Sequence, residues 1–158
     1  GVDEKDIVPR LEEMHEQIRS MRKINENLNF NLLLQNLDQN LNIQHGAQGM
    51  KIITGRFSDI DADLLRELGD EIKAKYQGTV IILALIKTDG NVQLLAMADK
   101  IALQAGVHAG KIIKVLAPVL GGGGGGNAQM AQAGGKDSSK IDHAFSLLPG
   151  LLEEQVGH

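Results

Sequence analysis

The 158-residue chain has no cysteine and no tryptophan, and its aromatic residues are three phenylalanines and one tyrosine. Without cysteine it can form no disulfide, no thiol nucleophile and no cysteine-ligated zinc site. So few aromatic rings provide no platform on which single-strand binders stack unpaired bases. No apolar run reaches about 18 residues, the length of a membrane-spanning helix, and no secretion signal is recognisable. We therefore expect a soluble, cytoplasmic protein without membrane partners.

A surplus of positive charge is also missing. The formal net charge is -4, which argues against the broadly basic surface typical of nucleic-acid binders. Only residues 100–158 hold slightly more Lys and Arg than Asp and Glu. The 42% share of hydrophobic residues suffices for one ordinary core, and one domain of typical size is expected. Because the chain opens on Gly1 rather than on methionine, we expect it to be a piece of a longer product.

Apolar residues near the N-terminus recur at alternating steps of four and three, with Asn25 in the one gap. This spacing is typical of a coiled-coil seam, and it predicts a helix over residues 4–42 within a helical arm of residues 1–47. An apolar stripe of this length needs a partner. Two alternatives stay open, which are packing within the chain and pairing of two copies in a homodimer. The seam residues are Ile7, Leu11, Met14, Ile18, Met21, Leu28 and Leu32.

Residues 48–158 alternate between strand and helix patterns. A short β-branched run predicts a strand over residues 51–57, and an amphipathic pattern predicts a helix over residues 61–76. Two apolar runs, residues 79–87 and 91–97, are joined by an Asp-Gly turn and predict a hairpin whose first strand is covered on both faces. Further helices are expected over residues 109–120 and 139–155, the latter interrupted at Pro149. The fold class is therefore α/β, with a small mixed β-sheet flanked by helices and a long N-terminal helical arm.

Six consecutive glycines are the most unusual feature of the sequence: Gly121, Gly122, Gly123, Gly124, Gly125 and Gly126. They predict a loop whose bare backbone amides can approach a phosphate closely. The alternative is a flexible hinge. A Walker A site does not fit, because Asp137 follows Lys136 where Ser or Thr is required, and ATP is not indicated. The next residues, 127–136, are small and polar and end again in glycine, which is typical of a shaped surface rather than of a linker.

These segments together resemble a known family. A helix over residues 109–120, the glycine cluster, and Met-Ala-Gln-Ala-Gly-Gly over residues 130–135 occur in this order in the C-terminal DHH-associated domain of alanyl-tRNA synthetases. The resemblance is sharp over residues 107–142, covers residues 50–156 in layout, and includes the arm as a helical spacer. The chain departs from the family at Asn127, Ala128 and Gln129, where Arg-Pro-Asp is common, so it lacks a basic side chain that could bind phosphate there.

The resemblance implies a non-catalytic, tRNA-binding domain. It would contact the outer corner, or elbow, of tRNA(Ala) and couple the aminoacylation and editing domains of a parent alanine–tRNA ligase. ATP and zinc would belong to other domains of that parent. The implied partners are tRNA(Ala), those other domains, and a second copy through the arm or the globular domain.

The candidate RNA-facing residues follow from the same resemblance. They are the six glycines together with Gln132, Gly134 and Gly135. Four lysines flank the glycines in sequence and are candidates to neutralise phosphates: Lys111, Lys114, Lys136 and Lys140. The alternative is that these lysines are ordinary solvated side chains.

No catalytic or metal site is predicted. The five histidines lie far apart, no HExxH pattern occurs, and His143, beside Asp142, is interpreted as an ordinary helical residue. Two other functions stay as alternatives. One is the substrate-binding C-terminal domain of a DHH-type phosphoesterase, and the other is an oligomerisation module that uses the arm.

Overall fold

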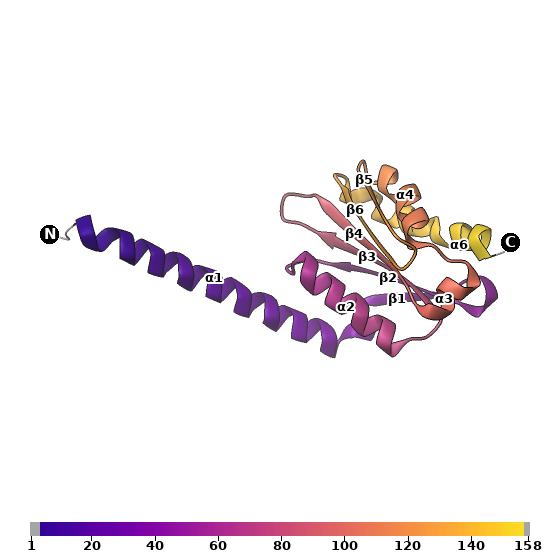
Figure 1. The fold of residues 1–158 in the computed structure, drawn as a ribbon, viewed down its shortest axis with the longest axis horizontal. Coiled ribbons are helices and arrows are strands. Elements are labelled where there is room, and N and C mark those ends of the chain that lie inside the picture. Colours follow the sequence, from indigo (N-terminus) through magenta and orange to yellow (C-terminus); the bar gives the residue numbers. More distant parts are fainter. Residues whose placement is uncertain (1–3, 157–158) are drawn as a thin grey trace.

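A computed structural model describes residues 4–156, so residues 1–3 and 157–158 of the predicted ranges lie outside the described residues. A long helix, α1, runs away from a globular body that contains all the other described elements (Figure 1). The elements in chain order are α1 (Glu4–Gln35), η1 (Leu37–Gln39), β1 (Leu41–His45), η2 (Ala47–Gly49), β2 (Lys51–Phe57), α2 (Ala62–Lys75), β3 (Thr79–Ile86), β4 (Val92–Ala98), α3 (Lys100–Ala105), α4 (Ala109–Val119), β5 (Gly123–Gly126), β6 (Met130–Gly135), η3 (Ser138–Lys140), α5 (Ile141–Ser146) and α6 (Leu148–Val156).

The body is built on one six-stranded mixed sheet with the strand order β1-β2-β3-β4-β6-β5. The pair β2 and β3 is parallel and joined through α2, whereas every other neighbouring pair is antiparallel. Seven of the eight residues of β3 are buried. A strand in the middle of a sheet that is covered on both faces has a continuous apolar sequence. The predicted central position of residues 79–87 is therefore confirmed.

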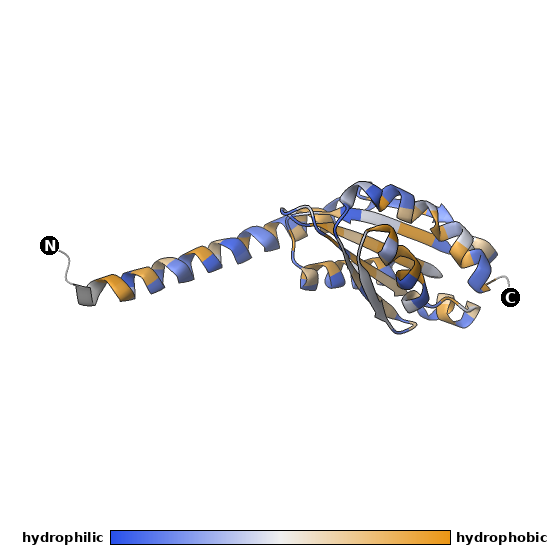
Figure 2. Ribbon diagram, turned by 90° about the horizontal axis from the view of Figure 1, so that it is seen from above, coloured by the Kyte–Doolittle hydropathy of each residue, from blue (hydrophilic) through white to orange (hydrophobic). Residues whose placement is uncertain are grey.

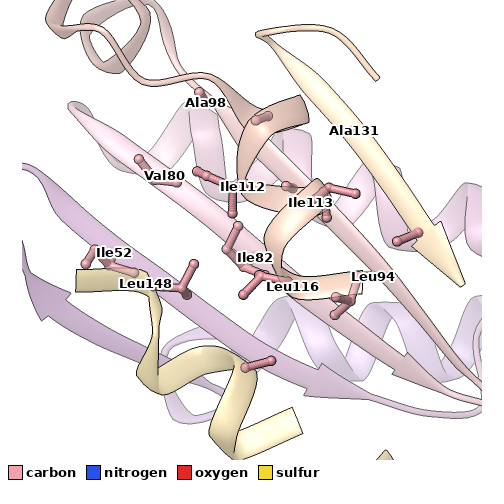
Figure 3. Close-up of a cluster of buried hydrophobic side chains, with 14 of the residues drawn as sticks. Ile52, Val80, Ile82, Leu94, Ala98, Ile112, Ile113, Leu116, Ala131 and Leu148 are labelled. Atoms are coloured by element: carbon pink, nitrogen blue, oxygen red, sulfur yellow. The ribbon is translucent and has the colours of Figure 1, made fainter. Parts of the chain in front are cut away.

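Two hydrophobic cores fill the two faces of this sheet. On one face, α2 packs Leu65, Leu68 and Ile72 against β3 and β4. On the other face, Ile112 and Leu116 of α4 pack against the same strands, and Leu148 and Leu152 of α6 belong to the same core. Figure 3 shows the second core, in which Ile82 of the sheet meets Ile112 and Leu116 of α4, with Leu148 of α6 close by. The predicted α/β class with flanking helices is confirmed.

The helix boundaries are set by side chains that bind backbone groups at the helix ends. Asp61 accepts a hydrogen bond from the Leu64 amide (2.8 Å) at the start of α2. Asp99 does the same for Ala102 (2.8 Å) at the start of α3, and it also accepts from the Gly78 amide (2.6 Å). Such N-caps satisfy amides that the helix itself leaves unpaired.

The arm helix ends earlier than the sequence predicts, at Gln35 rather than near residue 42. Asparagine side chains explain the difference, because they bind nearby backbone carbonyls: Asn36 donates to Leu32 O (3.2 Å) and Asn40 donates to Asn36 O (3.1 Å). Such local bonds compete with the helix. The chain then forms η1 and enters the sheet as the edge strand β1, which the sequence analysis did not predict.

The prediction that the glycines form a loop is also wrong in part, because Gly123–Gly126 form strand β5, which pairs with β6. The last helical stretch divides into η3, α5 and α6. Its break falls at Leu147, two residues before the predicted Pro149, which lies in the first turn of α6. That is where a helix accommodates proline, since the amide is unpaired there in any case. No described helix is long and apolar enough to cross a membrane.

The seam of α1 is exposed. Its apolar side chains retain between 43% (Ile7) and 68% (Met21) of their accessible surface, and Figure 2 shows apolar and polar residues alternating along the coloured length of α1. Only the last turns contact the body, where Phe30, Leu33 and Leu34 pack against the core beneath α2. Within the described residues, packing in the same chain therefore does not cover the seam from Ile7 to Leu32.

Candidate nucleic-acid interface

The glycine strand belongs to a hairpin, β5–β6, that is fastened lengthwise to α4. At the start of α4, the amides of Ala109 and Gly110 donate to the carbonyls of Ala128 and Asn127 in the hairpin turn (3.0 Å each). At its end, the Gly122 amide donates to Ala117 O (3.0 Å). These bonds use helix-terminal groups that would otherwise be unpaired. The glycines are therefore held in place rather than free.

Asn127 organises the turn of this hairpin. Its Oδ1 accepts hydrogen bonds from the amides of Gln129 (2.9 Å) and Met130 (2.8 Å). This is the local bonding by which Asn favours turns. At the position where the family resemblance leads us to expect a basic side chain, the chain therefore has a residue that fixes the turn.

Every second glycine is required by close packing. A Cβ on Gly124 would overlap the carbonyl oxygen of Gln132, and a Cβ on Gly122 would overlap that of Gly134. A Cβ on Gly126 would lie 2.5 Å from Ala131 Cα. Any side chain at these three positions would push β5 away from β6.

The glycines in between are different, because a Cβ on Gly123 or Gly125 would meet nothing within 4 Å, and the same holds for Gly134. Gly125 is paired with Gln132, which is paired with Leu95, so all three lie on the face of the sheet that α2 covers. However, the packing of α2 is centred on β3 and β4, which leaves the β5 end of this face largely uncovered. We call the uncovered surface formed by Gly123, Gly125, Gln132 and Gly134 the open face.

A shallow depression of about 430 Å³ adjoins the open face. Lys136 and Lys87 line it together with Gly121, Gly122 and Gly134. The Lys136 amide donates to Leu120 O (2.8 Å), which keeps this lysine beside the glycines. Of the four predicted lysines, the structure brings Lys136 to the glycine strand on this side.

The other predicted lysines occupy different surfaces. Lys111 and Lys114 are exposed on α4. The buried side chains of α4 pack on the face of the sheet that is opposite to the open face. Lys111 lines a separate depression with Glu154 and Gln155 of α6. Lys140 is exposed in η3, where Ser139 donates to Asp137 and thereby lowers the pKa of that carboxyl below its usual value. The predicted cations therefore lie around the hairpin and not in one cluster.

Sequence analysis missed two cations of the site, Arg66 and Lys87. Arg66 lies on α2, and Gln132 Oε1 accepts hydrogen bonds from its Nε (2.8 Å) and Nη2 (3.3 Å) when the Gln132 amide is oriented toward the guanidinium. Lys87 directly follows β3. Both are distant from the glycines in sequence, so only the fold brings them near. Among the side chains of residues 7–156, no three His, Asp or Glu gather as a metal site would require.

Comparison with known proteins defines the class of this site. The DHHA1 domain family matches residues 49–154, so the chain belongs to that family. The alanine–tRNA ligase of Acetivibrio thermocellus is 41% identical over 96% of this chain, and that of Lachnoclostridium phytofermentans is 39% identical over 95%. The chain spans only 17% of the length of each of these two relatives.

Solved structures narrow the class further. The C-Ala domain of alanyl-tRNA synthetase from Aquifex aeolicus has a TM-score of 0.64 and 29% identity, covering 70% of this chain and 97% of that domain. Within its family, the chain thus corresponds to the non-catalytic C-terminal domain of alanyl-tRNA synthetases. A pGpG-specific phosphodiesterase from Vibrio has a TM-score of 0.53 at 11% identity, covering 98% of this chain and 52% of that one, and shares the fold alone.

Proposed function

We propose that this domain holds tRNA(Ala) for a longer alanine–tRNA ligase and contacts the outer corner of the tRNA through β5 and its flanks. The observation that supports the proposal best is the glycine strand itself. β5 is the last strand of the sheet, and five of the six glycines at residues 121–126 are exposed, with no side chain to shield their backbone. Backbone amides without a neighbouring Cβ can approach a sugar-phosphate chain closely.

The cations around the hairpin support the same proposal. Lys136 lies on one side of β5, and Lys111 and Lys114 lie on the helix that covers the other side. A nucleic-acid backbone that crosses the β5 edge meets both groups, and Lys140 lies just beyond β6. With one tyrosine and three phenylalanines in the whole chain, such an interface recognises phosphates and shape rather than stacked bases.

In the parent ligase this contact has a mechanical role. By holding the outer corner of the tRNA, the domain keeps one bound molecule within reach of aminoacylation and editing sites on other domains, and α1 sets the distance between them. ATP and zinc belong to those other domains. The parent works in the cytoplasm, and this domain performs no chemistry itself.

The test is a titration of the 158-residue chain with full tRNA(Ala) and with an acceptor-stem minihelix that lacks the elbow, at two salt concentrations. We expect tighter binding of the full tRNA and a marked loss of affinity at the higher salt, because phosphate contacts release bound counterions. Equal affinity for the two RNAs would move the contact away from the elbow. The absence of salt-dependent binding would contradict the proposal.

The lysines can be ranked with single variants. Lys136→Gln removes the cation beside the exposed glycines and is expected to weaken tRNA binding more than Lys114→Gln on the outer side of α4. Removing one cation that binds a phosphate should lower the salt slope by about 0.7–0.9. An unchanged slope for both variants would mean that these lysines are ordinary solvated side chains.

Pairing of two copies through α1 is a second function that one observation favours. The exposed seam keeps its alternating spacing over the length of the helix, and Asn25 takes one of its positions. If Leu11 and Ile18 are assigned to the first position of the heptad, Asn25 takes that same position. There a single Asn specifies register and two-stranded assembly in coiled coils. We therefore propose that a second copy of this chain covers the seam.

The mass of the chain in solution, measured by light scattering over a range of concentrations, tests this pairing. We expect a dimer that Ile18→Glu abolishes, because the substitution places a charge in the seam. The matched control is Ser20→Glu, two residues away and outside the seam. A monomeric mass at every concentration would contradict the proposal. If this chain formed a dimer but the full-length protein did not, another part of the parent would cover the seam.

A further inference from the structure

Arg66 is held at the margin of the open face by a neutral partner. With the Gln132 amide oriented toward the guanidinium, Oε1 accepts from both Nε and Nη2, at 2.8 and 3.3 Å. Gln132 is half-buried in β6, where it stands beside Leu95 on one side and opposite Gly125 on the other. The guanidinium is thereby fixed next to the β5 end of the sheet, which α2 leaves largely uncovered.

The charge of Arg66 is not neutralised by this contact. A guanidinium has five N–H donors, and an amide oxygen that binds two of them fixes the plane of the group without removing its charge. Among the described residues, no carboxylate lies within 4 Å of Arg66, whereas Arg56 is paired with Asp142 and Lys75 with Asp38. Arg66 therefore retains donors and a positive charge for a ligand.

The surroundings select the class of ligand. Gly123, Gly125 and Gly134 leave open space beside Gln132, so a bulky chain can approach the sheet there. Lys136 and Lys87 line the depression that adjoins this space. A planar fork of donors beside further cations matches a phosphate, which it can bind through two parallel hydrogen bonds.

We propose that Arg66 binds a phosphate of the tRNA backbone on the open face, and that Gln132 is the positioning residue that orients it. This inference rests on the function proposed above and adds a contact to it. Asp63 and Asp70 are exposed on α2, one turn to either side of Arg66. Their charges repel RNA that lies along α2, so the phosphate reaches Arg66 from the side of β5.

The first variant to measure is Arg66→Gln in the 158-residue chain, titrated with tRNA(Ala) at several salt concentrations. We expect binding about tenfold weaker, since a hydrogen bond to a charged group contributes that order of affinity. The salt slope should fall by about 0.7–0.9, the value for one phosphate contact. The matched control is Arg19→Gln, which removes the same charge from the exposed arm and should change neither quantity.

A second variant separates positioning from charge. Gln132→Leu leaves the guanidinium charged but removes the acceptor that orients it, so affinity should fall while the salt slope stays that of the unaltered chain. Arg66→Lys should behave in the same way, because it keeps the charge and loses the planar fork. Thermal unfolding of all variants shows whether the tie between α2 and β6 also stabilises the fold.

Three results would overturn the inference. If Arg66→Gln retained both the affinity and the salt slope, Arg66 would not bind phosphate, although the function proposed for the domain would stand. If the variant lost affinity with an unchanged slope and a lower Tm, the pair would be purely structural. If the unaltered chain showed no salt-dependent tRNA binding, neither the inference nor the proposed function would stand.

Discussion

The body and the arm use apolar residues in opposite ways. In the body, Ile112, Ile113 and Leu116 of α4 have no accessible surface, and they belong to one of two cores that cover both faces of a single sheet. In the arm, Ile18 and Met21 keep 46% and 68% of their surface. The apolar content of the two regions therefore does not indicate their role, and what distinguishes them is whether a covering layer is present in the same chain.

This difference separates stability from association. A body with two closed cores has the long-range contacts of a domain that folds cooperatively on its own. A helix with a continuous exposed stripe gains most of its stability from a partner, because an isolated helix in water is marginal. We infer that the body determines the thermal transition of the chain and that the arm determines its assembly.

The largest effect is expected from truncating a core residue of the body. Ile113→Ala should lower the free energy of unfolding by about 2–5 kcal/mol, because it removes buried methyl groups and leaves a cavity. Ile18→Ala in the arm should change it by less than about 0.5 kcal/mol at concentrations where the chain is monomeric. Denaturant unfolding of both variants measures the two values. Similar losses would show that the arm and the body unfold as one unit.

A smaller contrast lies within β5, because a side chain at one position would overlap β6 whereas a side chain at the next would point into open space. Gly124→Val should lower the free energy of unfolding by about 1–3 kcal/mol, since its side chain would overlap the backbone of β6. Gly123→Val points to open space and should leave folding nearly unchanged, yet weaken tRNA binding by obstructing the open face.

Thermal unfolding and tRNA titration of the two glycine variants, side by side, check this contrast. If Gly123→Val lost stability and affinity together, the glycines would be structural throughout. If it lost neither, RNA would not approach the strand from the open face.

Much of the fold could be predicted, because it follows from local patterns. The β-branched runs of β2 and β3 and the Asp-Gly turn before β4 carry strong strand and hairpin signals. β1 was missed because its asparagine and glutamine residues resemble the polar end of the arm. β5 was missed because glycine has no strand preference of its own, and its pairing with β6 depends on the fit of the hairpin along α4.

The candidate site was less predictable than the fold. The glycines and Gln132 stand out in sequence because their order resembles that of a known family, and Lys136 because it closely follows the glycines. Arg66 and Lys87 carry no such signal, since ordinary helices and strand ends hold many exposed cations. Arg66 is near the open face because α2 brings it to Gln132, and Lys87 is near it because the end of β3 lies one strand away from β6, across β4.

The smallest effect is expected at the junction of arm and body. Asp38 of η1 accepts hydrogen bonds from Lys75 (2.8 Å) and from the Tyr76 hydroxyl at the end of α2. The bond from Lys75, more than that from Tyr76, lowers the pKa of Asp38, and the bond to Asp38 raises the pKa of both Lys75 and Tyr76. The junction joins the arm to the body through exposed groups, whose ion pairs contribute little.

The direction of the pH dependence follows from these shifts. Asp38 stabilises the fold above its ordinary pKa of 3.8, and this contribution is lost as the pH falls through its lowered folded pKa. Lys75 and Tyr76 stabilise it below their ordinary pKa values of 10.5 and 10.0, and their contribution is lost as the pH rises through the raised folded values. Asp38→Asn should therefore lower Tm slightly between these limits and converge with the unaltered chain outside them. Calorimetry of Asp38→Asn and the unaltered chain across that pH range tests this prediction. If the difference between their Tm values persisted unchanged at low pH, the junction would not depend on the charge of Asp38.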